Sequence, residues 1–579
     1  FRSNIDGDIS ENVRLQFNLH GRLEDRNYPT QSTFATFRMA QQSKPTMPAY
    51  WPNGKPGPDI EYGQNPVVIS TEETGYDDEE SYYFQSSLGV EAEIPAISGL
   101  TLNGDVAYDQ TFRQQKLWQT PWELWYWDYQ SRDEQGNPDL TSAFRGYPEP
   151  RLSQEHESTK DVMLRGTARY ESGLGENHNY SVLLGSEYQW ADNSWFSAFR
   201  RFYASDKIEE LFAGGEAQRS NNGSGWHSSR LNYFTRVNYD YEQKYLFEFV
   251  GRYDGSYIFP EGNRFGFFPG FSVGWRLTQE DWFTNAVGFF DELKLRGSWG
   301  QTGNDQIEPY QYMRTYQFGS GYVLGGAVQN SITQARVPNT SITWEVANQL
   351  DVGVSGGVLD NRLTFEVAYF DYLREDILWW RGASIPESAG FSLPRENIGE
   401  VRSWGVDGTV GYGQDLTSNI SFQANGNFSY ATNEIQYWAE SPGAPEYQKS
   451  TGAPMNTELY YRANGVFNDQ AEIDNNPSWP GARPGDIRFE DVNGDGKING
   501  LDRVRIDENS TPNIIYGLDL NASIHNFDAR IQFQGAAQVR QYVQTAFAGE
   551  FGTYWEKFAE RRWTPENPER EHPRAYNRQ

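Results

Sequence analysis

The stretch from Leu350 to Tyr372 alternates apolar and polar side chains along two limbs joined by a short turn. Successive side chains of a β-strand point to opposite faces, so each limb has one apolar face and one mostly small or polar face. The turn holds Asp360 and Asn361, which tolerate left-handed backbone. Each limb has about ten residues, the length with which a tilted strand crosses a bilayer. The hairpin predicts either two membrane-spanning strands or a soluble antiparallel sheet with one wet face.

Recurrence of the pattern favours the membrane. We count roughly 15 candidate strands, which come as pairs joined by short turns and separated by long irregular stretches. The long stretches are residues 25–80, residues 111–160, a loop ending near Ser229, and residues 431–510. Outer-membrane barrels have this asymmetry, with short turns on the periplasmic side and long loops outside. A closed bacterial barrel needs an even number of strands, so the count predicts either a missed strand or an incomplete barrel.

Composition supports the same architecture. Aromatic residues make up 16% of the 579 residues, Gly is abundant at 56, and mean hydropathy is −0.77. Transmembrane barrels combine these properties because half of each strand faces water and aromatic girdles mark both interfaces. The chain has no Cys and no apolar run long enough for a transmembrane helix. Its net charge of −30 argues against a nucleic-acid partner, which requires clustered Lys and Arg.

Residues 491–502 (DVNGDGKINGLD) have the spacing of a calcium loop. Carboxylates and amides stand at positions 1, 3, 5, 9 and 12, Gly496 stands at position 6 where a sharp turn needs it, and position 7 offers a backbone carbonyl. The predicted Ca²⁺ ligands are Asp491, Asn493, Asp495, Lys497, Asn499 and Asp502. The ion would brace a loop rather than signal, because no flanking helices are evident. The alternative is an Asp- and Gly-rich turn that binds nothing.

The second long stretch is rich in aromatic side chains that could contact a ligand or partner. They are Trp118, Trp122, Trp125, Tyr126 and Trp127. Aromatic rings in an irregular loop could stack on sugar rings or grip a protein, and they could equally pack the loop on itself.

We find no signature of an enzyme. The six His residues are scattered, and the sequence has no nucleophile elbow, phosphate-binding Gly loop or credible triad. Acidic pairs such as Glu79 with Glu80 are explained as solvated charge. We therefore expect a protein without catalytic activity.

Eight short runs together resemble the SusC-like (starch-utilisation and RagA type) TonB-dependent transporters of Bacteroidetes outer membranes. They are RYDGS at 252–256, FPGFSVGW at 268–275, LKLRGSWGQTGN at 293–304, PN at 338–339, TWE at 343–345, NIGEV at 397–401, GDIRF at 485–489 and RWTP at 562–565. They occur in the family's order, and upstream of residue 250 we find no diagnostic motif.

The resemblance implies an all-β, 22-stranded transmembrane barrel in the bacterial outer membrane, with long extracellular loops. We expect residues 1–579 to be one barrel domain that lacks the family's N-terminal plug, TonB-contacting segment and closing strands. The first ten residues are not a signal peptide, so the chain is mature or its beginning is absent.

Two functions from different classes are compatible with the family resemblance. The first is TonB-dependent import of oligosaccharides or peptides together with a SusD-like surface lipoprotein. The alternative is a non-transport scaffold or interaction subunit of a larger outer-membrane assembly or secretion complex.

Overall fold

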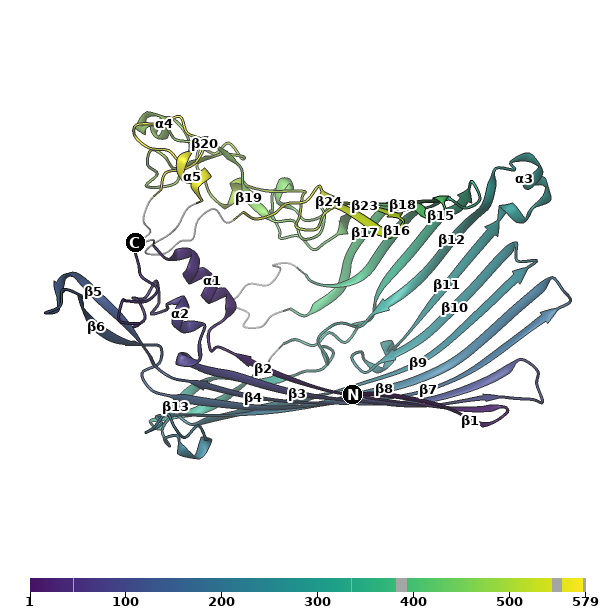
Figure 1. Cartoon of the computed structure of the whole chain (residues 1–579), viewed down its shortest axis with the longest axis horizontal. Helices are drawn as coiled ribbons and strands as arrows, with labels where there is room; N and C mark the ends of the chain where they lie inside the picture. Colours follow the sequence, from purple (N-terminus) through teal and green to yellow (C-terminus); the bar gives the residue numbers. More distant parts are fainter. Residues whose placement is uncertain (45, 335, 382–392, 544–554, 576–579) are drawn as a thin grey trace.

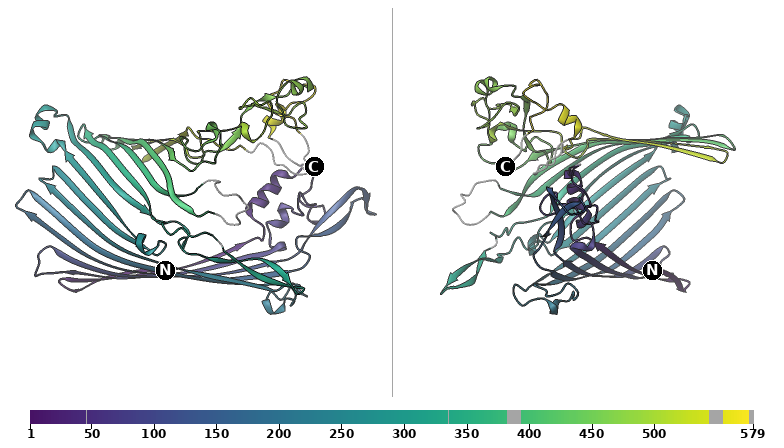
Figure 2. Two further views of the ribbon diagram at one scale, coloured as in Figure 1. Left: turned by 180° about the vertical axis from the view of Figure 1, so that it is seen from behind. Right: turned by 60° about the vertical axis from the view of Figure 1, so that its left-hand side comes forward.

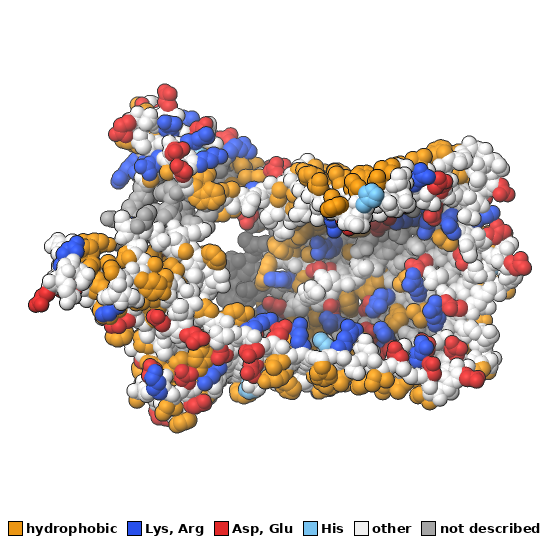
Figure 3. Space-filling view, viewed as in Figure 1, with side chains coloured by type: hydrophobic (Ala, Val, Ile, Leu, Met, Phe, Trp, Pro, Cys, Tyr) orange, Lys and Arg blue, Asp and Glu red, His pale blue; other side chains and the backbone are white. Residues whose placement is uncertain are grey.

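The computed structural model describes residues 1–44, 46–334, 336–381, 393–543 and 555–575. Its main feature is one curved sheet of 16 strands (Figure 1), and the concave side of the sheet is hollowed (Figure 3). Each strand pairs antiparallel with its sequence neighbour in the sheet, so the order is a continuous meander from β1 to β24. Within the described residues these two edge strands each have a single neighbour. The predicted all-β barrel architecture is confirmed.

The main sheet contains β1 (Arg2–Ser10), β2 (Val13–Tyr28), β3 (Gly75–Glu93), β4 (Leu100–Gln119), β7 (Arg151–Leu174), β8 (His178–Arg201), β9 (Ser220–Tyr241), β10 (Tyr245–Ser256), β11 (Phe265–Arg276), β12 (Phe290–Asn304), β15 (Glu345–Val358), β16 (Leu363–Trp380), β17 (Arg395–Thr417), β18 (Ile420–Tyr437), β23 (Ile514–Ile524) and β24 (Phe527–Ala537).

Four small two-stranded sheets and several short helices lie in the connections. The small sheets pair β5 (Trp122–Arg132) with β6 (Pro138–Arg145), β13 (Tyr316–Leu324) with β14 (Ala327–Gln334), β19 (Leu459–Tyr461) with β22 (Arg503–Arg505), and β20 (Ala463–Val466) with β21 (Ile487–Phe489). The helices are α1 (Thr33–Gln42), α2 (Pro66–Ile69), α3 (Asp281–Ala286), α4 (Gln470–Asn475) and α5 (Glu556–Glu560), with 3₁₀ turns η1 (Glu72–Thr74), η2 (Leu211–Ala213), η3 (Glu261–Asn263), η4 (Leu277–Gln279), η6 (Glu446–Gln448) and η7 (Gly500–Asp502). None of the helices in the described part of the chain has the length and apolar content of a membrane span.

The two ends of the sheet differ as the sequence predicts. Short turns and the compact α3 segment lie at one end, on the right in Figure 1, and the long connections gather at the other. The turn between β15 and β16 places Leu359, Asp360 and Asn361 in the left-handed region, with φ of 60°, 59° and 57°. Asp360 and Asn361 therefore adopt the left-handed backbone conformation that the sequence predicts for this turn.

The two faces of the sheet differ in chemistry. The convex face carries exposed apolar side chains in register from strand to strand. One such row runs from Leu295 through Val354 to Val367. The concave face carries charged and amide side chains, which Figure 3 shows gathered inside the hollow between apolar margins. This is the distribution expected where lipid lies outside and water inside.

The apolar band on the convex face has visible limits. At the short-turn end a chain of stacked and tilted rings joins Tyr241, Tyr245, Trp275 and Trp282, with successive ring centroids 6.2–6.3 Å apart. At the other end charge returns where Arg402 pairs with Asp371. Between Phe365 and Asp371 on β16 the band is about 20 Å long. An aromatic girdle at the edge of an apolar band is typical of outer-membrane barrels.

The strands are longer than the sequence predicted, and this corrects the expected loops. β7 and β8 have 24 residues each, about 80 Å of extended chain, so both continue well beyond the apolar band. Residues 111–160 are therefore strand ends plus the β5–β6 hairpin rather than an irregular loop. Outside the membrane both faces of a strand meet water, and the alternation that marks a strand fades.

Strands β1, β13 and β14 were also missed. The loop predicted at residues 431–510 begins later, because β18 continues to Tyr437, and the rest of it is largely loop as predicted.

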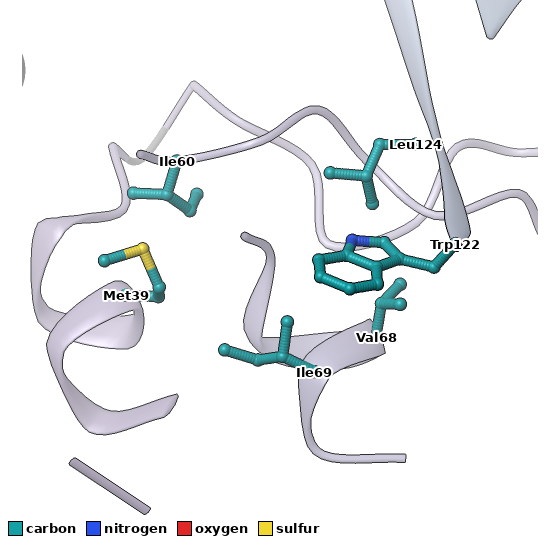
Figure 4. Close-up of a cluster of buried hydrophobic side chains, with 6 residues drawn as sticks. All are labelled: Met39, Ile60, Val68, Ile69, Trp122 and Leu124. Atoms are coloured by element: carbon teal, nitrogen blue, oxygen red, sulfur yellow. The ribbon is translucent and has the colours of Figure 1, made fainter. Parts of the chain in front are cut away.

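A small hydrophobic core holds the first long connections. We call residues 29–74 and 120–150 the loop cap. Within it the six buried side chains Met39, Ile60, Val68, Ile69, Trp122 and Leu124 point toward one another between α1, α2 and the first residues of β5 (Figure 4). The indole N–H of Trp122 donates to the carbonyl of Gly63 at 3.1 Å. The β5–β6 hairpin is thereby fixed at the mouth of the hollow.

Candidate functional site

The concave face, which we call the lumenal wall, carries ion pairs that join different strands of the main sheet. Their N–O distances are at most 3.2 Å. The pairs are Arg113 with Glu79 and Glu155, Arg165 with Asp105, Arg236 with Glu248, Arg296 with Glu366, and Arg530 with Asp519. Exposed pairs of this kind contribute little to stability. They do give a water-filled passage a lining of both charges, which suits polar solutes.

One pair of the wall shows how the sequence makes room for it. Arg296 on β12 reaches across β15 to Glu366 on β16, with 2.5 Å between the charged atoms. The residue beneath is Gly353, where an added Cβ would lie 2.7 Å from Arg296 Nε. The glycine therefore allows the guanidinium to cross an intervening strand.

A hollow of about 810 Å³ lies against the wall near the short turns. Its lining combines Lys294 and Arg296 with Glu248 and Asp351, together with amide and hydroxyl groups from β7 to β12. Apolar side chains, among them Leu246, Phe247 and Val273, share the lining, so the hollow offers both polar and apolar contacts.

The aromatic residues predicted to contact a ligand separate into two groups. Trp118 and Trp122 are buried, with 2% and 7% of their surface exposed, and both belong to hydrophobic clusters. Trp125, Tyr126 and Trp127 are half-buried on the same strand. Residue type alone could not separate the groups, because the helices that bury Trp122 lie more than 50 residues upstream.

Tyr126 and Trp127 line a cleft of about 630 Å³ in the loop cap. Trp51 meets Trp127 edge to face at 6.4 Å, and its indole N–H donates to the carbonyl of Trp125 at 2.9 Å. The other side of the cleft is formed by Asp59, Glu61 and Tyr62, which the sequence did not indicate as site residues. These residues lie in a segment marked chiefly by its prolines, and only the fold brings them to the hairpin.

The polar groups of the cleft are already engaged. The Tyr126 hydroxyl donates to Asp59 Oδ1 at 2.7 Å, and Glu61 pairs with Arg38 at 2.7 Å. Burial, followed by the hydrogen bond to the Asp59 carboxylate, raises the pKa of Tyr126 to about 12. The cleft therefore keeps a neutral phenol beside a paired carboxylate over the physiological pH range.

The predicted calcium loop folds compactly. Asp491 accepts backbone N–H groups from Gly494 and Gly496 at 2.9 and 2.8 Å, and Asp502 is fully buried and accepts those of Val492 and Asn499. Gly496 has φ of 79°, so the predicted need for glycine at position 6 is confirmed. The N–H of Lys497 donates to Asp495 and lowers the pKa of that carboxyl.

The loop supplies oxygen ligands, yet its carboxylates do not converge on one point. Across the described ranges no three His, Cys, Asp or Glu side chains are placed to hold a metal ion. Asn493 and Asn499 instead contribute amides, and Asn493 bonds Asp495 at 3.1 Å. Calcium binding at this loop stays a prediction.

Comparison with known proteins decides the family. The model of the TonB dependent receptor-like, beta-barrel family matches residues 16–533. This chain belongs to that family. It is an outer-membrane receptor barrel, and the family is one of receptors and transporters rather than enzymes.

Curated relatives match most of this TonB-dependent receptor barrel. A TonB-dependent receptor of Formosa agariphila is 28% identical over 446 residues, which cover 72% of this chain and 43% of the relative. The TonB-dependent receptor SusC of Bacteroides thetaiotaomicron is 26% identical over 458 residues, covering 72% of this chain and 44% of SusC. The chain thus spans less than half the length of these relatives.

A solved structure confirms the fold. The structure of the RagAB peptide transporter superposes with a TM-score of 0.77 at 20% identity, covering 100% of this chain and 62% of that one. The predicted SusC-like resemblance is confirmed by these matches.

Several residues of the recognised runs have structural roles in this receptor barrel. Asn397 donates to the carbonyl of Thr343 at 2.9 Å and accepts the N–H of the same residue at 3.0 Å. Trp344 is buried against Phe259 and Phe268. These contacts tie the connection before β15 to β17, to β11 and to the segment that follows β10.

Proposed function

We propose that the protein imports oligosaccharides or peptides across the outer membrane, driven by TonB. The observation that carries this proposal is the lumenal wall, whose concave face bears paired charges, with Arg296 also bordering the hollow near the short turns. A barrel that only anchored other proteins would have no need for a polar interior of this kind. The curated SusC relative and the peptide transporter of similar fold support import.

A SusD-like surface lipoprotein is the proposed partner. The long connections gather at one end of the barrel, where a second protein could cover the mouth (Figure 2). Similarity to SusC and to the RagAB peptide transporter supports this proposed partner. The TonB contact belongs to the whole protein and is proposed from the family.

We also propose that Ca²⁺ braces the loop at Asp491–Asp502. Its ligands would come from Asp491, Asn493 and Asp495, with the backbone carbonyl of Lys497. The surrounding connection contains only short helices and strands, so an ion would add order where few side chains are buried.

Uptake in the native host tests the function. Fluorescently labelled oligosaccharides and labelled peptides are supplied to cells with and without the gene, and to cells lacking TonB. We expect uptake of one of the two ligand classes, oligosaccharides or peptides, to require both the gene and TonB. Normal uptake after deletion, combined with loss of an envelope complex that co-purifies with the barrel, would establish the scaffold function instead.

A further inference from the structure

Two tyrosines at the cleft of the loop cap occupy a backbone conformation that bulky residues avoid. Tyr62 has φ of 54° and Tyr129 has φ of 64°. Left-handed backbone costs a residue with a side chain about 1–2 kcal/mol, and Gly, Asn or Asp normally fills such positions. Both tyrosines line the same cleft, from segments 67 residues apart in sequence.

Local hydrogen bonds hold each tyrosine in place, Tyr62 in a tight turn and Tyr129 at an irregular position within β5. Tyr62 and Gly63 are the central residues of a turn closed by the N–H of Gln64 donating to Glu61 at 3.0 Å. Tyr129 follows Asp128, whose carboxylate accepts the N–H groups of Gln130 and Ser131 at 2.8 and 2.7 Å. These hydrogen bonds hold both tyrosines in the strained conformation. Backbone strain persists at functional sites when the surrounding structure fixes it in this way.

The two rings are displayed rather than packed. Tyr62 is 75% exposed and Tyr129 is 61% exposed. The ring of Trp127 packs against the ring of Tyr129, with 5.1 Å between the ring centroids. The Arg38 guanidinium lies over one face of the Tyr62 ring, 5.5 Å from its centroid. The strained backbone therefore holds two largely exposed rings at the cleft, and burial of the rings in the core cannot be the reason.

The polar groups between the rings select among ligands. Asp59 and Glu61 could attract a cation, but Tyr126, Arg38 and Arg145 already engage them, with Arg145 3.9 Å from Asp59. Their remaining lone pairs suit neutral donors such as hydroxyl groups. A sugar ring offers both requirements, because its C–H face is apolar and its edge carries hydroxyls.

We propose that this cleft binds a neutral oligosaccharide, with Tyr62 and Tyr129 as stacking platforms and the Asp59–Glu61 edge as hydroxyl acceptor. The volume of about 630 Å³ is within the usual range for small-ligand sites. The inference rests on the proposed import function and specifies oligosaccharides, rather than peptides, as the substrate class.

Asparagine variants test the proposal without the usual doubt about folding. Tyr62→Asn and Tyr129→Asn remove the rings and place a residue that tolerates left-handed backbone, so each variant should melt at the same or a higher temperature. Loss of one ring contact should weaken binding about 3- to 10-fold, and the double variant should weaken it further. Tyr322→Ala, on the distant β13–β14 hairpin, is the matched control, since Tyr322 is also an exposed tyrosine and lies beside an irregular position of its strand.

Binding is measured by calorimetry on the whole protein in a detergent without a sugar headgroup. The probes are maltohexaose, cellohexaose, xylohexaose, mannohexaose, laminarihexaose and agarohexaose, with a tryptic digest of casein as the competing class. Binding of at least one glycan that weakens in both Asn variants and not in Tyr322→Ala supports the proposal. Binding of none of them, unchanged affinity in the Asn variants, or binding of peptides alone overturns it.

Cellular uptake by the same variants separates this inference from the proposed function. Glycan binding without TonB-dependent uptake would leave the cleft assignment standing and reject import. Uptake that continues unchanged in the double Asn variant, at glycan concentrations below the measured Kd, would leave import standing and reject the cleft as its capture site.

Discussion

The wall and the loop cap of this receptor barrel are ordered by different forces. In the wall each strand bonds its neighbours along its length, as in the 24 paired positions between β7 and β8, and few wall side chains are buried. The cap has little regular pairing and depends on one small cluster around Trp122 and Leu124. Wall order is thus distributed along the backbone, whereas cap order is concentrated in a few side chains.

The difference predicts where the molecule is sensitive. A backbone ladder tolerates the loss of most single side chains, provided that the convex face stays apolar and the concave face stays polar. We expect the loop cap to lose its ordered structure when a side chain of its one hydrophobic cluster is truncated. Substitutions in the two regions therefore test whether the forces are truly separate.

The largest effect is expected from Trp122→Ala in the cap. Truncating a buried Trp costs about 3–5 kcal/mol, and the cluster has only six buried side chains to absorb the loss. Hydrogen exchange should speed up in residues 33–70 and 122–145 while the wall strands keep their protection. Phe144→Ala on the same hairpin, where the ring is 71% exposed, is the control and should leave exchange unchanged. Equal loss of protection in β7 and β8 would show that wall and cap form one cooperative unit.

A charge on the convex face should come next. Val352 lies midway along the apolar band, paired with Gly297 and Tyr369. Val352→Arg should cost about 2–4 kcal/mol, the penalty for Arg near the bilayer midplane. Heat-modifiable migration on gels measures assembly in vesicles. Gln349→Arg, on the concave side of the same strand, should assemble normally, and equal failure of both variants would contradict the assignment of faces.

The wall was the predictable part of the molecule. Alternation identified the two faces of β15 and β16 because each side chain there has lipid or water as its neighbour. The same rule failed for β1, whose apolar positions are Ile5 and Ile9 around a Gly, and for the uncharged Gly- and Ser-rich β13–β14 hairpin. Strand ends outside the membrane were likewise missed, since water on both faces removes the signal.

The candidate site was predictable only in part. The sequence indicated Tyr126 and Trp127, but it gave equal weight to Trp118 and Trp122, whose burial is decided by distant segments. Tyr62 and Asp59 carry no signal of their own, because a tyrosine in a left-handed turn is the reverse of what turn preferences predict. The spacing of Asp491–Asp502 did predict its glycine turn, since that requirement is local.

Removing calcium extends the comparison to a second cap-like region, residues 485–510. If Ca²⁺ at 100 times its Kd occupies the loop, binding contributes about 2.7 kcal/mol to local order. Limited proteolysis with and without a chelator should show faster cleavage within this range and unchanged cleavage elsewhere. Asp491→Asn should cleave at the faster rate in both conditions. Identical cleavage patterns with and without chelator would reject the site.

The same region should be sensitive to acid, with a defined sign. The pKa of Asp495 is lowered by the N–H of Lys497 and by Asn493, so the folded loop favours the ionised carboxyl. The resulting stability is fully present above the ordinary pKa of an Asp and is lost as pH falls below it. Cleavage of the metal-free loop by an acid-active protease should accelerate on the acid side of that value. Asp495→Asn should flatten the dependence, and a profile unchanged by this variant would assign the transition to another carboxyl.

The smallest effect is expected at the lumenal wall itself. Arg296 and Glu366 form a close pair, but both side chains are more than a third exposed, and exposed pairs contribute under about 1 kcal/mol. Arg296→Gln should therefore leave assembly and thermal stability nearly unchanged, with Arg296→Lys as the charge-retaining control. If the pair serves solutes rather than structure, Arg296→Gln should alter uptake of charged peptides more than that of neutral glycans. A loss of stability comparable to that of Val352→Arg would mean that the wall is held by its side chains, and the contrast with the cap would fail.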